Sequence, residues 1–165
     1  EIDGTLLKFH GPKGSLEKRL PHPLIKIGME NDSVKIEVIK KYTKNKKRIA
    51  KTFKSHIKNC LIGVTNGYIY HLKIVSGHFP MTVALDHNKL IIKNFLGEKS
   101  PRKADILSNV KASIKGDEIT IESIDKEAAG QSAANIEQAT RITNRDRRRF
   151  QDGIFITNKP DRNIK

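Results

Sequence analysis

The sequence has little of what a disulfide-stapled or membrane-spanning protein requires. Its 165 residues include one cysteine and no tryptophan, and aromatic residues make up 5% of the chain. The single thiol, Cys60, cannot form an internal disulfide, which fits a reducing compartment. No apolar run approaches the roughly 20 residues of a membrane helix. The start at Glu1, which is not a Met, shows no signal-like pattern. We therefore expect no membrane contact.

Acidic residues are also scarce. The chain has 32 lysines and arginines against 18 aspartates and glutamates, for a formal net charge of +14. Residues 1–73 carry sixteen basic and six acidic side chains, and residues 74–165 carry sixteen and twelve. A surplus of this size, clustered along the sequence, favours a polyanionic partner, of which nucleic acid is the commonest. A merely soluble basic domain is the alternative interpretation.

Signals for catalysis are missing as well. The stretch "GPKGS" at residues 11–15 lacks the spacing of a phosphate-binding loop. His56 and Cys60 stand four residues apart, but no second such pair would complete four metal ligands. No nucleophile motif frames the serines, histidines and aspartates. We therefore expect no enzyme activity, no catalytic residue, no metal site and no cofactor.

A weak internal repeat is present. The stretch "NDSVKIEV" at residues 31–38 resembles "GDEITIES" at residues 116–123, with Asp32 aligned to Asp117. Both stretches alternate apolar and polar residues as strands do. Short strand patterns precede each copy and a helical pattern follows it. The same unit of strands followed by a helix therefore occurs twice.

The repeat predicts an α+β fold of two tandem related domains, residues 1–73 and residues 74–165. Each would be a small antiparallel-rich sheet with a helix packed on one face. The first helix is expected over residues 47–65 and should stop at Gly67, because glycine tolerates the left-handed cap conformation. The second should begin at Asp125, a favourable N-cap.

Spacing also predicts which helix residues are buried. The first helix has an apolar face at three- and four-residue spacing, formed by Ile49, Phe53, Ile57, Cys60, Leu61 and Val64. The second helix has a face of mostly small residues, formed by Ala129, Ala133, Ile136 and Thr140. Gly130 inside this helix costs roughly 1 kcal/mol relative to alanine, so close packing against the sheet is expected there.

A stripe of lysines follows the other side of the first helix. Lys47, Lys51, Lys54 and Lys58 recur at helical spacing, and no acidic residue lies among them. A solvated helix surface is the ordinary interpretation of such a stripe. Lysines without interleaved acids repel one another, however. We predict that Lys51, Lys54 and Lys58 contact phosphates or the acidic side chains of a partner.

The densest arginine cluster lies in "ATRITNRDRRRFQDGIFI", residues 139–156. Its members are Arg141, Arg145, Arg147, Arg148 and Arg149. Asp146 and Asp152 cannot neutralise all five, so local pairing is incomplete. The following "GIFIT" should be a strand of the second sheet. Anchoring by that strand lowers the entropy lost when guanidinium groups bind phosphates. The scarcity of aromatic residues favours recognition of folded RNA by shape and phosphate contacts over stacking on single strands.

Several segments together resemble a known family. They are "HGPKGSLEKRL", "TFKSHIKNCLIGVTNGY", "SGHFPMTVAL", "KNFLGEKSPRK" and "AANIEQATRITNRDRRRFQDGIFI", in that order. The chain is similar over residues 4–157 to the large-subunit ribosomal protein six family, also called universal protein six, whose eukaryotic cytosolic member is numbered nine. The most specific features are "HFP" followed by "NFLGEK", and the long carboxy-terminal segment. They are more similar to eukaryotic members than to bacterial ones.

This resemblance implies two related α+β domains in a structural constituent of the cytosolic large ribosomal subunit that supports translation. It implies binding of large-subunit rRNA near the sarcin–ricin loop and the stalk base, beside neighbouring large-subunit and stalk-base proteins. The second domain would be the main anchor, through Lys99, Arg102 and Lys103 and the five arginines. The sequence after Lys103, "ADILSN", lacks arginines that family members often carry there. A basic module that binds an acidic protein partner is the alternative.

Overall fold

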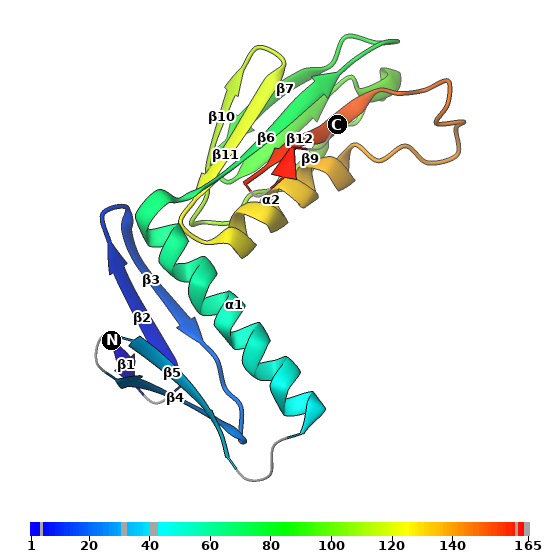
Figure 1. The fold of residues 1–165 in the computed structure, drawn as a ribbon. Coiled ribbons are helices and arrows are strands. Elements are labelled where there is room, and N and C mark those ends of the chain that lie inside the picture. Colours follow the sequence, from blue (N-terminus) through cyan, green and yellow to red (C-terminus); the bar gives the residue numbers. More distant parts are fainter. Residues whose placement is uncertain (4, 31–32, 40–42, 161, 164–165) are drawn as a thin grey trace. The chain divides into compact units, whose positions relative to one another are not determined.

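The computed structural model describes residues 1–3, 5–30, 33–39, 43–160 and 162–163. The chain forms two compact units, Glu1–Gly67 and Tyr68–Lys165. Each unit combines antiparallel strands with one α-helix (Figure 1). The predicted α+β class with two tandem units is therefore confirmed.

The first unit contains two small sheets and a long helix. Strands β1 (Ile2–Asp3), β2 (Leu6–Gly11) and β3 (Gly14–Arg19) form a three-stranded sheet, and β4 (Ile25–Glu30) pairs with β5 (Ser33–Val38). Helix α1 (Lys44–Asn66) packs against β2, β3 and β5. Asn31 and Asp32 of the repeat lie outside the described residues.

Helix α1 begins earlier than its apolar pattern predicts. The Thr43 hydroxyl accepts a hydrogen bond from the amide of Lys46 at 3.4 Å, so the helix starts at Lys44. It ends at Gly67 as predicted, with φ of 73° at that glycine. Leu61 was predicted on the buried face but is 49% exposed, because a residue adjacent to Cys60 points about 100° away from it around the helix.

Gly11 allows helix α1 to approach the first hairpin closely. A Cβ atom at this position would lie 2.6 Å from the carbonyl oxygen of Val64. The same oxygen accepts a hydrogen bond from the amide of Lys13 at 3.1 Å. The β2–β3 turn therefore satisfies a carbonyl of the last helical turn, which has no partner within the helix.

The second unit is built on a five-stranded sheet, in the order β10–β11–β6–β12–β13, and a three-stranded sheet, β7–β8–β9. Its elements are β6 (Tyr68–Val75), β7 (Thr82–Asp86), β8 (Lys89–Lys93), the 3₁₀ turn η1 (Phe95–Gly97), β9 (Arg102–Asp105), β10 (Lys111–Lys115), β11 (Glu118–Ser123), α2 (Lys126–Ala139), β12 (Gly153–Lys159) and β13 (Arg162–Asn163). Helix α2 contacts β6, β9, β11 and β12.

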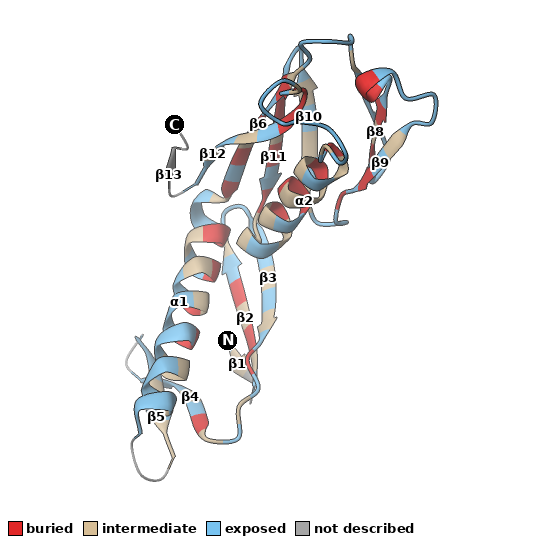
Figure 2. Cartoon of the chain, turned by 90° about the vertical axis from the view of Figure 1, so that its right-hand side faces the viewer, coloured by how far each residue is buried: buried red, intermediate tan, exposed pale blue. Residues whose placement is uncertain are grey.

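Strand β6 sets the division between the units. It pairs with β11 on one side and with β12 on the other. Its alternate side chains Tyr68, Tyr70, Leu72 and Ile74 are buried, and the last three belong to the core of the second unit (Figure 2). The division therefore falls after Gly67, whereas the sequence places it after Lys73.

The internal repeat corresponds to a repeated order of elements. Strand β5 is the second strand of a hairpin that precedes α1, and β11 is the second strand of a hairpin that precedes α2. The two similar stretches thus occupy equivalent places in the two units.

Helix α2 confirms the predicted cap and the predicted face. The Asp125 carboxylate accepts a hydrogen bond from the amide of Glu127 at 2.9 Å. The side chains of Ala129, Ala133 and Ile136 are fully buried. A Cβ atom on Gly130 would lie 3.1 Å from the Tyr70 hydroxyl, so the helix approaches β6 closely at the position that sequence indicates.

Replacement of Gly11 by alanine should destabilise the first unit. The added methyl group would meet a backbone oxygen that cannot move without disturbing the end of α1. We expect a loss of about 1–3 kcal/mol, the usual cost of overpacking. Thermal unfolding followed by circular dichroism measures the loss, and amide hydrogen exchange would assign it to residues 1–67.

Gly28→Ala is the matched control. A Cβ atom there has no neighbour within 4 Å, and the residue lies in strand β4 of the same unit. Because glycine weakens a strand, alanine at this position should be neutral or slightly stabilising. Equal effects of the two substitutions would contradict the close approach at Gly11.

Candidate nucleic-acid interface

The five clustered arginines lie on the segment that joins α2 to β12, drawn in orange in Figure 1. We call residues 141–151 the arginine loop. All five arginine side chains are exposed. Within the described part of the chain, Arg148 alone forms an ion pair, with its Nη2 atom 3.0 Å from Oδ2 of Asp146. Hydrogen bonds from Arg148 hold the pKa of that carboxyl below its ordinary value.

Asp146 organises the middle of the loop. Its carboxylate accepts a hydrogen bond from the amide of Arg148 at 2.9 Å, an Asx-type turn. Its carbonyl oxygen accepts from the amides of Arg149 and Phe150, at 3.1 and 3.0 Å. This single turn presents consecutive arginines to solvent from a defined backbone.

The first end of the loop is fixed by three hydrogen bonds, one of them buried. The Thr140 hydroxyl, which is buried, accepts a hydrogen bond from the amide of Ile154 at 2.9 Å. Nη1 of Arg102 donates to the carbonyl oxygens of Ala139 and Arg141, at 2.9 and 3.0 Å. The carboxyl end of α2 is thereby tied to both β12 and β9.

Arg102, a predicted RNA contact, is engaged within the protein. It donates to both carboxylate oxygens of Glu98, at 2.8 and 2.6 Å, and lies 4.2 Å above the ring of Phe95. The hydrogen bonds from Arg102 lower the pKa of Glu98. This geometry favours a positioning role for Arg102, since each of its three nitrogens already donates to an acceptor within the protein. Lys99 and Lys103 on the same segment are exposed.

The second end of the loop is fixed by Asp152. This carboxylate is 3% exposed and accepts hydrogen bonds from the amides of Gly77 and His78. Its Oδ2 atom lies 2.6 Å from Nδ1 of His78. The His78 ring stacks on Phe150 with centroids 4.7 Å apart, and Arg145 lies 5.0 Å from the centroid of the same Phe150 ring.

Asp152 pairs with His78 and forms no ion pair with the arginines within the described residues. Burial alone would raise the pKa of its carboxyl, but the hydrogen bonds from His78 and Gly77 outweigh burial and hold the pKa below the ordinary value. The carboxylate therefore stays ionised and is committed to the loop that contains residues 77 and 78.

The lysine stripe lies elsewhere. Lys51, Lys54 and Lys58 are exposed on α1 in the first unit. The arginine loop belongs to the second unit. The predicted site residues are thus divided between the two units.

Other kinds of site find no support in the described residues. Among them, no three histidine, cysteine, aspartate or glutamate side chains are grouped so that they could hold a metal ion. No helix in the described part of the chain is both long enough and apolar enough to cross a membrane.

Comparisons with known proteins agree with the resemblance. The family model described as "Ribosomal protein L6" matches residues 1–67 and again residues 79–153. The chain is 45% identical to "Large ribosomal subunit protein uL6" of Nanoarchaeum equitans, over 98% of this chain and 88% of that protein. It is 45% identical to the protein of the same name from Methanobrevibacter smithii, over 96% and 88%. For Haloarcula marismortui the identity is 43%, over 98% and 90%.

Asp152→Ala should destabilise the second unit by about 1–3 kcal/mol near neutral pH, because two backbone amides lose their acceptor. The folded pKa of Asp152 lies below its unfolded value. Its stabilisation is therefore fully present above the unfolded pKa of about 3.9 and is lost as pH falls through the folded pKa. Denaturant unfolding at a series of pH values should show the variant and the wild type converging in acid.

Asp105→Ala serves as the control for this comparison. Its carboxylate is 79% exposed and lies 3.6 Å from the ammonium group of Lys89. Exposed pairs of this kind contribute little. A pH-independent difference between wild type and Asp152→Ala would show that the ionised carboxylate is not what fixes the loop.

Proposed function

The chain belongs to the ribosomal protein L6 family, a family of large-subunit ribosomal proteins and not of enzymes, and from this premise we propose that it binds large-subunit rRNA mainly through its second unit. The binding site comprises the arginine loop together with Lys99 and Lys103. Its place in the cytosolic large subunit is near the sarcin–ricin loop and the stalk base, beside the proteins of that region. The first unit adds contacts through the lysine stripe.

The arginine loop is the observation that carries this proposal. Arg141, Arg147 and Arg149 are exposed and form no ion pair within the described residues, while the backbone around them is tied to the sheet. Guanidinium groups bind phosphate oxygens bidentately, and fixing the loop beforehand lowers the entropy lost on binding. Folded RNA presents phosphates at high density, so it matches this surface.

Removal of two unpaired charges tests the loop directly. Arg147→Gln with Arg149→Gln should weaken binding to large-subunit rRNA and lower the dependence of log affinity on log salt concentration. Each lost phosphate contact lowers that slope by roughly 0.7–0.9, so a total of about 1.4–1.8 is expected. Filter binding across a salt series measures both quantities.

The control removes the same charge from another exposed part of the second unit. Lys111 and Lys115 are exposed on β10, so their replacement by glutamine leaves the arginine loop intact. A loss of slope equal to that of the arginine variant would show that net charge, and not the loop, determines binding.

The lysine stripe is tested in assembled subunits. Lys51→Gln, Lys54→Gln and Lys58→Gln together should allow the protein to be washed from the subunit at a lower salt concentration, because screened charge contacts are lost. This holds whether the lysines meet rRNA phosphates or the acids of a neighbouring protein. Sedimentation of washed subunits with immunoblotting gives the salt concentration of half-release.

A triple variant of Lys13, Arg19 and Lys26, each changed to glutamine, provides the control. These residues are exposed in the same unit and lie off the stripe. Equal half-release points for the two triple variants would mean that the stripe is a solvated helix surface.

A further inference from the structure

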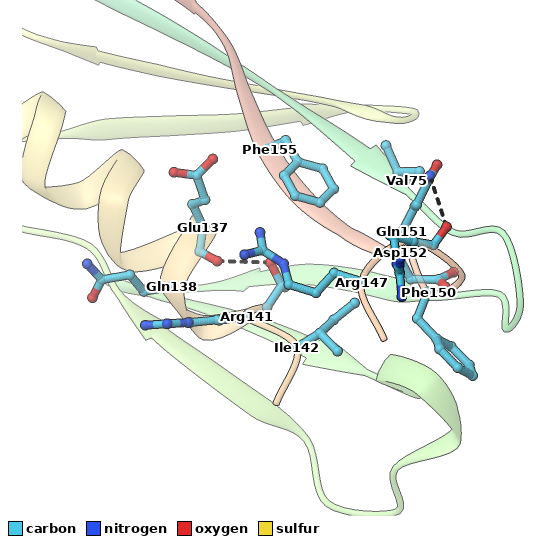
Figure 3. Close-up of a pocket in the computed structure, with 12 residues that line it drawn as sticks. Val75, Glu137, Gln138, Arg141, Ile142, Arg147, Phe150, Gln151, Asp152 and Phe155 are labelled. Atoms are coloured by element: carbon cyan, nitrogen blue, oxygen red, sulfur yellow. Dashed lines mark hydrogen bonds between the residues drawn. The ribbon is translucent and has the colours of Figure 1, made fainter. Parts of the chain in front are cut away.

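A hollow opens beside the arginine loop, between the end of α2 and the start of β12 (Figure 3). Val75, Ile142 and Phe155 give it an apolar part. Arg141 and Arg147 give it a basic part, and neither of these arginines forms an ion pair within the described residues. The hollow thus combines an apolar surface with two available cations.

Phe155 presents its ring on the open face of the five-stranded sheet. The preceding residue, Ile154, is fully buried, whereas Phe155 is 38% exposed, as the alternation along a strand requires. Gly153 makes room for the ring, because a Cβ atom on that residue would lie 2.9 Å from Cζ of Phe155. The ring is therefore seated over the backbone of its own strand.

The ring of Phe155 also lacks the stacking partners that two other phenylalanine rings of the second unit have. Phe95 is covered by the guanidinium group of Arg102, and Phe150 stacks on His78. For Phe155, no aromatic or cationic group of the described residues stacks on the ring. Its exposed surface is free to receive a flat group from outside.

The apolar and polar side chains that line the hollow are complementary to a single nucleotide. A base has an apolar flat face and a polar edge, and aromatic side chains stack on it whatever its identity. The side chains of Glu137 and Gln138 line the hollow and offer hydrogen-bonding groups for the edge of a base. Oε1 of Glu137 already accepts from the amide of Ile156 at 3.3 Å, which orients that carboxylate.

We propose that this hollow binds one unpaired nucleotide of the rRNA, with its base stacked on Phe155 and its flanking phosphates at Arg141 and Arg147. This inference rests on the proposed rRNA-binding function and specifies one site within it. Besides phosphate contacts, the site would then require an rRNA base that is not paired within an RNA helix.

Phe155→Leu tests the site, because leucine keeps an apolar side chain but removes the ring. The probe is the large-subunit rRNA transcribed from the same organism, with affinity measured across a salt series. The variant should bind about 5- to 150-fold more weakly, the value of one base–aromatic stack. The salt slope should not change, since no phosphate contact is lost. Phe155→Tyr, which keeps the ring, should bind as the wild type does.

Phe79→Leu is the matched control. This phenylalanine is 44% exposed in the same unit, but its ring packs beside Gly97 and does not line the hollow. Its replacement should change affinity by less than about twofold, well below the effect of one base stack. Equal affinities of Phe155→Leu and Phe79→Leu would overturn the inference, as would a lowered salt slope for Phe155→Leu.

A second measurement uses the wild-type complex, so it does not depend on any variant folding. Ultraviolet irradiation followed by mass spectrometry should yield a crosslink between Phe155 and a base of the rRNA. Crosslinks confined to other residues would overturn the inference. Failure of the wild type to bind rRNA in a salt-dependent way is a different outcome, because it would refute the proposed function itself.

Discussion

Both ends of the arginine loop are held by hydrogen bonds to the rest of the second unit, and the ordered arrangement of its charges depends on these bonds. Like charges on adjacent residues repel, and the loop contains a single acidic residue, Asp146. A free segment would respond by spreading out. Thr140 and Asp152 prevent this by bonding, through a hydroxyl and a carboxylate, to backbone amides of β12 and of the loop after β6. The repulsion therefore remains in the folded protein, and an anionic partner at the loop would relieve it.

Local signals made much of the fold predictable. Asp125 as a helix cap, Gly67 as a helix stop and the packing at Gly130 each depend on a few neighbouring residues, and each is confirmed. The start of α1 was missed because its first turn has no apolar residue that would extend the periodic pattern. Leu61 was misplaced because a six-residue apolar set is wider than the buried face of a helix packed on a small sheet.

The hydrogen bonds that fix the candidate site could not be predicted in the same way. Asp152 accepts from Gly77, 75 positions earlier in the chain, and Arg102 donates to the carbonyl of Ala139, 37 positions later. Nothing near these residues in the sequence indicates such partners. The sequence therefore identifies basic residues as a class but does not separate Arg102, whose donors are used within the protein, from Arg147, which forms no ion pair in the described residues.

The amino-acid composition of the chain also indicates less about how RNA is recognised than the positions of individual side chains do. A chain with 5% aromatic residues has few rings for base stacking, and this argues for phosphate contacts alone. Under our proposal one ring is sufficient, because Phe155 is exposed, lies over Gly153 and lines the hollow together with Arg141 and Arg147. Phosphate contacts supply affinity to any folded RNA, whereas a stacking site accepts only a base that is unpaired. Combining the two would let a basic protein select one place on a large RNA without reading its base sequence.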